Sequence, residues 1–527
     1  MTADAPKNAS AQDWLAVFAG ALGALIATLD ISIVNSALPQ IQGEIGATGT
    51  EGTWIATGYL VSEVVMIPLS AWLSRLLGMR TLLLSCSSLF TVFSVLCGFS
   101  SSLMLMIIGR VGQGFFGGAL IPTAQTLVRT RLPPHQMPVG MTIFGLIVLL
   151  GPLLGPVAGG WLTENWSWQW CFFINIPVAI ALAFLLLGGL PYEPPNLKEL
   201  AQADWVGIAG LTVGLSCLTV VLEEGQREQW FQSNLIIGLA VCTVVGLLVL
   251  AYAQLTSPHP VIKLNLLKNR TYAGVIIIIV VLGMVLYDIL YVLPQFLGVV
   301  AGYNAEQSGW VLALSGVPAF IMLPLLPKIL GRGDARIMVF LGLVCFAVSC
   351  FLDIHLTAAS GGGDFVVSQL LRGFGQMLSF MPLNQISVGS VSRAETADAA
   401  GFFNMARNLG GSIGLALQGV FIDRRVEAHA DAIRESVTAN SVLLQERLAG
   451  QAAGLAARHG DLVYGTQQAI QQLALQIHQQ ALVMTYADCF WVLGIGLIVL
   501  MPLVLLLRGG RIMGGPGPQA RPQAVEA

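Results

Sequence analysis

Apolar residues occur along the chain in long runs that are separated by short polar segments. Fourteen of these runs are about 20 residues long, which is the length that an α-helix needs to cross the hydrocarbon core of a bilayer. The pattern therefore predicts an all-α integral membrane protein with fourteen spanning helices. The runs begin near residues 15, 53, 80, 103, 138, 168, 204, 234, 272, 307, 336, 364, 397 and 484.

The composition agrees with a membrane protein and argues against a set of soluble domains. Of the 527 residues, 55% are hydrophobic and 10% are charged, whereas about 25% are charged in soluble proteins. The mean hydropathy is +0.76. The first apolar run follows a single basic residue, Lys7, and is longer than the apolar part of a signal peptide. We expect it to be an uncleaved first helix.

The positions of lysine and arginine predict the orientation of the helices. These residues are enriched in the cytoplasmic loops of multi-pass proteins. Here they fall mainly in every second loop, which together with an even number of spans places both termini in the cytoplasm. Five arginines fall in one long outer segment, where the rule weakens with loop length. Three more lie inside predicted spans, namely Arg110, Arg372 and Arg407.

Cysteine, histidine and glycine usage argues against several kinds of chemistry. The eight cysteines lie in apolar runs without CxxC spacing, and the six histidines lie in loops or near the ends of spans. These patterns favour small apolar residues over disulfides or metal ligands. No GxxxxGK[ST] motif for nucleotide phosphates occurs. We therefore expect no enzyme activity, no cofactor and no metal, and an energy source that is an ion gradient or a partner protein.

An internal repeat predicts the architecture. The segment EGTWIATGYLVSEVVMIPL aligns with QSGWVLALSGVPAFIMLPL, so that Trp54 matches Trp310 at an offset of 256. The segment ALPQI that ends the first span matches VLPQF that ends the ninth, at an offset of 255. A repeat displaced by eight spans implies two six-helix bundles with two spans inserted between them. Repeats in the same orientation are the arrangement of major facilitator halves, which place the substrate site near the midplane between them.

The repeat and the loops together predict the boundaries of the domains. We expect a cytoplasmic N-terminus at 1–13 and a first six-helix bundle at 14–190. Two inserted spans with a cytoplasmic linker follow at 191–271. The second bundle covers 272–507 and contains a periplasmic helical hairpin at 424–483, and a disordered cytoplasmic tail covers 508–527.

Local motifs carry a specific resemblance. The chain contains LDISIVNSALP at 29–39, GRVGQGFFGGALIP at 109–122, and GPLLGPVAGG at 151–160 followed by WSWQWCFFINIP at 166–177. In this order and on these helices, the motifs resemble the fourteen-span drug:proton antiporters of the major facilitator superfamily, and closely the EmrB-type pump subunits. One position departs from the family pattern GxLaDRxGR. Arg75 in AWLSRLLGMR stands where the aspartate would be, which puts any latch that uses that carboxylate in doubt.

The resemblance implies a function. It indicates a proton-coupled antiporter that exports hydrophobic or amphipathic drugs and toxic compounds across the bacterial inner membrane. It further implies a tripartite system with a periplasmic membrane-fusion adaptor and an outer-membrane channel, and no nucleic-acid partner. Two alternatives remain. One is a dedicated exporter of a metabolite or siderophore with the same fold, and the other is a membrane sensor or scaffold that transports nothing.

Asp30 is the first candidate functional residue, because a lone carboxylate is costly in an apolar run. It lies about 8 residues before the outer end of span 1, and Arg110 lies about 8 residues after the outer start of span 4, so both are roughly 12 Å deep. We expect them to pair. Burial favours the neutral carboxyl and the arginine favours the charged one, so the balance suits proton loading and release. The alternative is a static ion pair that fixes two helices.

Further polar residues inside spans are candidates for the substrate cavity. Glu63 lies near mid-depth in span 2, and Asp288 lies within about a turn of the repeat-related position of Asp30. Intramembrane acids face a bundle interior or water, so each suits a second proton site or a counter-charge for a cationic substrate. A carboxyl that merely hydrogen-bonds between helices is the alternative. The other candidates are Asn35, Gln113, Asn384, Asn404 and Arg407, whereas the role of Arg372 stays open.

The stretch GPLLGPVAGG predicts a moving helix. Gly151, Gly155 and Gly159 recur every four residues and form one bare helix face, which allows close approach of another helix. Pro152 and Pro156 each remove a backbone donor and bend the helix. Such a helix suits a rocking interface between halves, and in the family that the chain resembles this motif marks antiporters.

The segment from about 423 to 485 differs from the rest of the chain. It is polar, lacks proline and carries apolar residues at helical spacing in SVLLQERLAGQAAGLAARH and TQQAIQQLALQIHQQALVM. Two amphipathic helices fit this pattern. Given the resemblance, we expect a docking element for the adaptor. A helical cap over the cavity is the alternative.

Overall fold

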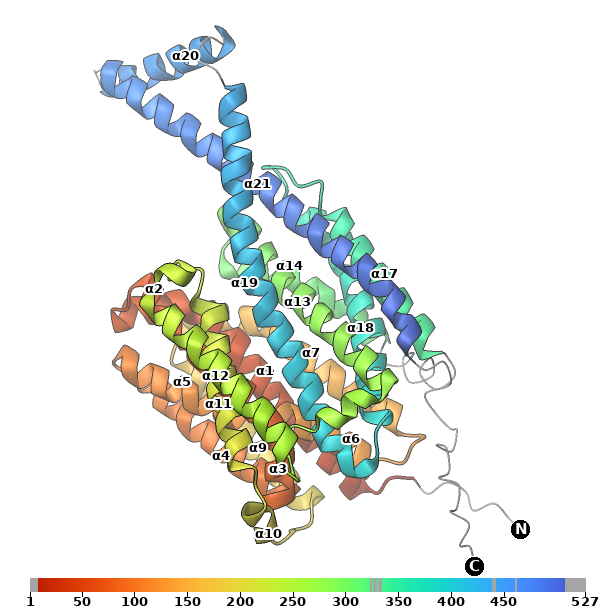
Figure 1. Cartoon of the computed structure of the whole chain (residues 1–527). Helices are drawn as coiled ribbons and strands as arrows, with labels where there is room; N and C mark the ends of the chain where they lie inside the picture. The colour runs from red at the N-terminus through yellow and green to blue at the C-terminus, as the bar shows by residue number, and fades with distance from the viewer. Residues whose placement is uncertain are drawn as a thin grey trace, which may run out of the picture.

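The protein is built from long helices. The computed structural model describes residues 8–322, 325, 329, 334–437, 442–459 and 462–507. Figure 1 shows two groups of roughly parallel helices, with three helix segments that project beyond the rest at one end. The end at which α1 begins and the last helix of the chain finishes is called the termini end below. The opposite end, where the three segments project, is called the hairpin end.

The first half of the chain supplies six spanning elements. Two of them consist of consecutive helices, α5 with α6 and α8 with α9. The elements are α1 (Ala11–Ile45), α3 (Trp54–Leu77), α4 (Met79–Gly98), α5 (Leu103–Gly117) with α6 (Leu120–Arg131), α7 (Met137–Asn165), and α8 (Trp170–Phe173) with α9 (Asn175–Gly189). A short helix, α2 (Gly49–Gly52), connects the first two.

Two further long helices follow the first half. They are α11 (Trp205–Glu224) and α12 (Asn234–Thr256), preceded by the short α10 (Leu197–Ala201). Glycines let these two helices pack closely, because a Cβ at Gly214 would come within 3.0 Å of the backbone nitrogen of Leu247. These helices occupy the place of the two predicted inserted spans.

The second half repeats the pattern with more interruptions. Short 3-10 turns separate or extend several of its helices. The elements are α13 (Arg270–Val299), α14 (Ala305–Ala313) with η3 (Leu314–Gly316) and α15 (Val317–Met322), α17 (Ala335–Leu352), α18 (Val366–Gly389), α19 (Thr396–Ser436), α20 (Val442–His459), and α21 (Leu462–Leu500) with η6 (Met501–Leu506).

Eleven helices in the described part of the chain are long and apolar enough to cross a membrane. The three predicted spans that are not among them correspond to α14 with α15, to α18 and to α19. The first is broken by η3, and the other two carry many buried polar side chains, such as Gln369, Arg372, Asn404 and Gln418. A span that packs inside a bundle needs fewer lipid-facing apolar residues, so the structure is consistent with fourteen spans.

Local signals fix the ends of several helices. Ser10 caps α1, because its hydroxyl accepts from the backbone nitrogen of Asp13 at 3.2 Å while the Asp13 carboxylate accepts from the backbone nitrogen of Ser10 at 3.0 Å. The helix ends at Gly46, whose φ of 72° is a left-handed conformation that glycine adopts without strain. Asn304 caps α14 in the same reciprocal way with Gln307.

Each half has its own hydrophobic core. One core is formed mainly by side chains from α1 to α11, and the other by side chains from α13 to α21 and η6. The internal repeat is visible in the first helix of each half, since Pro39 lies inside α1 and Pro294 lies inside α13. Two bundles with separate cores can therefore tilt against each other without breaking either core.

An ion-pair cluster joins the two halves at the termini end. The Asp398 carboxylate at the start of α19 is 3% exposed and contacts Arg75 Nη1 at 3.0 Å and Lys263 Nζ at 2.8 Å. Arg75, at the end of α3, also lies 3.6 Å from Glu199. Arg75 therefore has a carboxylate partner on the other half of the protein. A contact between the halves therefore exists at this position with a cation in place of the carboxylate of the family pattern, and we call Arg75, Lys263 and Asp398 the termini-end latch.

We expect Asp398→Ala to weaken this contact, because it removes the carboxylate that Arg75 and Lys263 share and leaves Arg75 with Glu199 alone. The measurement is a double-mutant cycle on apparent melting temperature in detergent, with Arg75→Ala, Asp398→Ala and the double variant. The coupling between the two sites should lie at about 1–3 kcal/mol, so that the double variant loses little more than Asp398→Ala alone. Strictly additive losses would contradict the latch. Glu199→Ala is the matched control for the other partner of Arg75.

Candidate functional site

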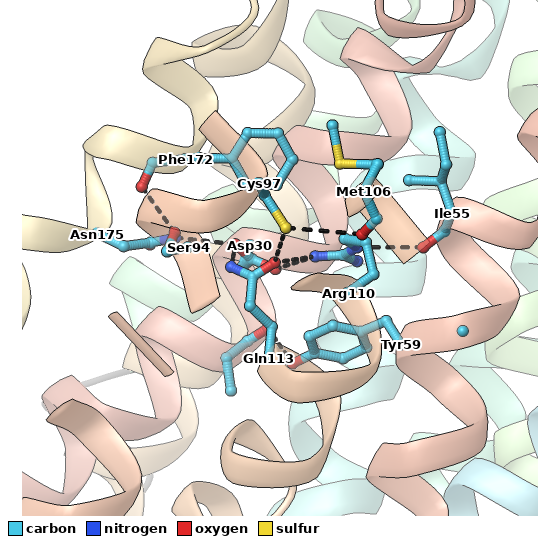
Figure 2. A network of polar contacts seen from close by, with 12 residues as sticks. Asp30, Ile55, Tyr59, Ser94, Cys97, Met106, Arg110, Gln113, Phe172 and Asn175 are labelled. Atoms are coloured by element: carbon cyan, nitrogen blue, oxygen red, sulfur yellow. Dashed lines mark hydrogen bonds and ion pairs between the residues drawn. The ribbon is translucent and has the colours of Figure 1, made fainter. Parts of the chain in front are cut away.

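The most deeply buried ion pair of the first half joins α1 to α5. Asp30 on α1 is 0% exposed and Arg110 on α5 is 1% exposed, and Arg110 Nη1 lies 2.5 Å from Asp30 Oδ2. Figure 2 shows the pair at the centre of a network of polar side chains. The depths in the sequence predicted this pairing, and the structure places the two groups in contact.

Asp30 accepts hydrogen bonds from three side chains. Besides Arg110, its Oδ1 accepts from Gln113 Nε2 at 3.0 Å and from Asn175 Nδ2 at 2.8 Å. Asn175 Nδ2 also donates to Ser94 Oγ at 3.0 Å. A buried carboxylate that receives several donors is hydrogen-bonded by the protein in place of water.

Arg110 connects the pair to α3. Its Nε donates to the carbonyl oxygen of Ile55 at 3.1 Å, and its guanidinium lies 4.4 Å from the ring centroid of Tyr59. The Tyr59 hydroxyl in turn donates to the carbonyl oxygen of Ala27 on α1 at 3.4 Å. Any change in the charge of Asp30 therefore acts on α3 as well as on α1 and α5.

Several members of this network were not among the predicted site residues. Asn175, Tyr59 and Ser94 each contact Asp30, Arg110 or their partners. Asn175 lies in the motif WSWQWCFFINIP, so its motif was a usable signal. Nothing in the sequence pattern singled out Tyr59 or Ser94. Gln113 was predicted to line the cavity between the halves, but it is 0% exposed and lies inside the first bundle beside Asp30.

Glu63 and Asp288 are buried acids on opposite halves. Glu63 on α3 is 2% exposed, and the cations close enough to act on it electrostatically are Arg407 and Arg110. Asp288 on α13 is 4% exposed. Its Oδ1 has no hydrogen-bond partner and its carboxylate no ion-pair partner among the residues that the structure describes. Asp30 and Asp288 are thus repeat-related acids in different environments.

The second half uses its own buried arginine differently. Arg372 on α18 and Arg110 on α5 are the two arginines among the buried side chains that the structure describes. Arg372 Nη2 lies 2.6 Å from Asp353 Oδ2, and both side chains are 2% exposed. Because Asp353 follows the end of α17, this pair fixes α17 to α18, and Arg372 is engaged away from Asp288.

The remaining predicted polar residues lie in several environments. Asn404 on α19 donates from Nδ2 to Gln125 Oε1 of α6 at 2.9 Å, which is a contact between the two halves. Arg407 bonds to the side chain of its neighbour Asn408 at 3.2 Å and 3.3 Å. Asn384 is 6% exposed and its Oδ1 has no partner within the described residues. Asn35 is exposed on α1.

The glycine face of α7 packs against α1. A Cβ at Gly151 would come within 2.8 Å of the Leu29 nitrogen, and one at Gly155 within 3.0 Å of the Ile33 nitrogen. At Gly159 it would come within 2.7 Å of the Ile33 carbonyl oxygen. The bare face therefore serves contact within the first half, next to Asp30.

The prolines of α7 have a different role. Pro156 lacks the backbone N–H that would bond to the carbonyl oxygen of Pro152, and Ser32 Oγ donates to that oxygen at 3.4 Å instead. Pro156 also faces the second half, because a Cβ at Gly309 of α14 would come within 3.0 Å of the Pro156 Cβ. Helix α7 thus contacts α1 with its glycines and α14 with a proline.

The model of the Major Facilitator Superfamily matches residues 20–415. The colistin resistance protein EmrB of Acinetobacter baumannii is 33% identical over 499 residues, which cover 94% of this chain and 96% of that protein. The multidrug export protein EmrB of Escherichia coli is 32% identical over 502 residues, with coverages of 94% and 95%. The fatty acid resistance protein FarB of Neisseria gonorrhoeae is 29% identical, with coverages of 97% and 99%.

Solved structures resemble the fold at low sequence identity. The proton:xylose symporter XylE gives a TM-score of 0.61 at 13% identity, covering 95% of this chain and 97% of that one. The human organic anion transporter MFSD10 gives 0.59 at 14% identity, covering 92% and 99%.

Proposed function

The chain belongs to the major facilitator superfamily, and we propose that it is a proton-coupled antiporter that exports hydrophobic or amphipathic drugs and toxic compounds. The observation that carries this proposal is the Asp30–Arg110 pair, a titratable group held inside a bundle that borders the interface between the halves. The names of the relatives, which include multidrug export proteins, support the choice of drugs as substrates. The same proposal places the protein in a bacterial inner membrane with both termini in the cytoplasm.

The proton step acts through the hydrogen bonds of Asp30. When Asp30 binds a proton it loses its charge, and Arg110 is left buried without a full counter-charge. Arg110 then interacts more strongly with its other partners, which are the carbonyl oxygen of Ile55 at 3.1 Å and the ring of Tyr59. Both belong to α3, whose other end carries Arg75 of the termini-end latch. Protonation therefore changes the force on a helix that reaches the interface between the halves.

The energy available is adequate for export. One charge that crosses a potential of 100 mV supplies about 2.3 kcal/mol. At about 1.4 kcal/mol per factor of ten, this sustains roughly a 50-fold gradient of substrate. We assign Glu63 and Asp288 to the substrate side of the cycle, as counter-charges for cationic substrates near the midplane. Asp288 suits this role because no cation within the described residues neutralises it.

The hairpin end is proposed to bind a periplasmic adaptor that continues to an outer-membrane channel. Helix α20 packs against α21, and both project beyond the bundle together with the end of α19 (Figure 1). Ile470 is 54% exposed and Leu475 is 66% exposed on α21. Apolar side chains at helical spacing outside the bilayer suit a groove or coiled-coil contact with partner helices.

Two other functions are less well supported. A dedicated metabolite or siderophore exporter would use the same fold and differ in substrate only. A sensor or scaffold that transports nothing has no need for the buried acids Asp30, Glu63 and Asp288 or for the two prolines inside α7. Proton flux in proteoliposomes separates a transporter from a sensor, and a substrate screen in a pump-deleted host identifies what is exported.

We expect Asp30→Asn to abolish proton-coupled export while the protein still inserts and folds, because asparagine keeps the shape but cannot carry a proton. The measurement is proton-driven substrate efflux from proteoliposomes, at equal amounts of monodisperse protein. Asp353→Asn is the matched control, since Asp353 is equally buried and also paired with an arginine. Efflux at the parent rate in Asp30→Asn would disprove the proton-carrier role.

We expect Glu63→Gln and Asp288→Asn to lose cationic substrates before neutral ones, because each removes a carboxyl group that can act as a counter-charge, without a large change in volume. Efflux of a matched cationic and neutral pair of dyes gives the ratio of the two rates. This ratio should fall by about tenfold, the effect of about 1.4 kcal/mol. An equal loss for both dyes would show that these acids do not select by charge.

Deleting residues 432–480 and bridging the gap with a short Gly-Ser linker tests the docking role. The deletion keeps the contacts of Arg425 and His429 with Asp488, which join α19 to α21 at the base of the projection. We expect transport in proteoliposomes to persist and whole-cell resistance to disappear. Loss of transport by well-folded deleted protein would instead identify the segment as a gate or cap.

A further inference from the structure

The inserted helix α11 touches both halves of the protein at the hairpin end. It packs against α3 of the first half and α19 of the second. Its side-chain hydrogen bonds to both halves come from its last turn and just beyond, where the sequence reads VLEEGQ. The termini-end latch closes the opposite end of the molecule, so α11 is placed to act where that latch does not.

One glutamate of this turn holds the first half. Glu224 Oε1 accepts from Thr57 Oγ1 at 2.5 Å, and Glu224 Oε2 accepts from Thr53 Oγ1 at 3.2 Å. The Glu224 side chain is 4% exposed and lies 3.7 Å from Arg227. Thr57 is two residues from both Ile55 and Tyr59, the two contacts of Arg110 on α3. Helix α11 is therefore fixed to the part of α3 that contacts the Asp30 network.

The preceding glutamate holds the second half. Glu223 Oε1 accepts from Ser412 Oγ of α19 at 2.7 Å. Three residues later, Gln226 Nε2 donates to Asp423 Oδ2 of α19 at 2.8 Å in an exposed position. Glu223 lies in the last turn of α11 and Gln226 in the turn that follows it, and both reach α19. Each forms a single bond across the interface, whereas Glu224 forms two within the first half.

We infer that α11 is a latch that closes the hairpin end: Glu224 fixes it to the first half, and Glu223 and Gln226 release α19 when that end opens. The inference rests on the proposed transport cycle, in which the two ends open alternately. Glu223 is then a positioning residue, because it sets the balance between the two states without contacting substrate. The inserted spans thereby take part in transport instead of only filling space beside the bundles.

The two latches should bias the molecule in opposite directions. Loss of the Glu223–Ser412 bond removes closure at the hairpin end and favours the state that is open there. Loss of Asp398 removes closure at the termini end and favours the opposite state. Substitution of a residue with a merely structural role would lower the stability of the protein and leave the ratio of the two open states unchanged.

The test measures the distance between spin labels on the two halves at the hairpin end. Labels at Ser101→Cys, after α4, and Ala358→Cys, after α17, occupy exposed positions. The background replaces Cys217, Cys242 and Cys345, the cysteines that are not buried, by alanine. The protein is studied in nanodiscs without substrate, so the result does not depend on which compound is exported.

Glu223→Ala and Ser412→Ala should each raise the ratio of long to short distances about tenfold, the worth of one hydrogen bond to a charged group. Asp398→Ala should lower the same ratio. Ser412→Thr keeps the hydroxyl and should restore the parent distribution. Glu228→Gln is the matched control, because Glu228 follows the same helix and bonds to Ser233 instead of α19.

Parent-like distances in Ser412→Ala, which removes one oxygen atom and preserves folding, would overturn the latch. So would an equal shift in Glu228→Gln. Failure of the proposed drug:proton antiport has a different signature, because efflux of every compound would then be absent from the parent protein while the distance shifts remain. If the proposed antiport and the α11 latch are both correct, Ser412→Ala should transport with slower turnover and little change in KM.

Discussion

A carboxylate can persist inside an apolar helix bundle only if the protein supplies the donors that water would supply. Asp30 obtains three, from Arg110, Gln113 and Asn175. These donors come from α5 and α9, and their own partners extend to α3 and α4. The network that solvates this one side chain therefore connects five helices of the first half, namely α1, α3, α4, α5 and α9.

The two halves share a fold but not a chemistry. In the first half the buried arginine neutralises the acid of the first helix, as Arg110 does for Asp30. In the second half Arg372 is paired with Asp353, and Asp288 is left without a cation among the described residues. Two acids at related positions of a repeated backbone therefore have different surroundings, and the different roles proposed for them above rest on this difference.

The sequence predicted the features that depend on the position of a residue along its helix. Hydrophobic run lengths located the spans, and equal depth predicted that Asp30 meets Arg110. It failed where the rotation of a helix decides the outcome: Gln113 shares α5 with Arg110, yet it faces Asp30 inside the bundle instead of the space between the halves. The pairing of Arg75 with Asp398 also escaped, since 323 residues separate them and no local pattern records the contact.

Helix α3 links the chemistry of the charge network to both ends of the molecule. Near its start, Ile55 and Tyr59 contact Arg110, and Thr57 contacts Glu224 of the inserted helix. Near its end, Arg75 contacts Asp398 of the other half. The 18 residues from Thr57 to Arg75 span about 27 Å at 1.5 Å per residue. The contacts of Arg110 and both contact regions thus lie on one helix, which gives the proposed proton step a direct connection to both ends of the molecule.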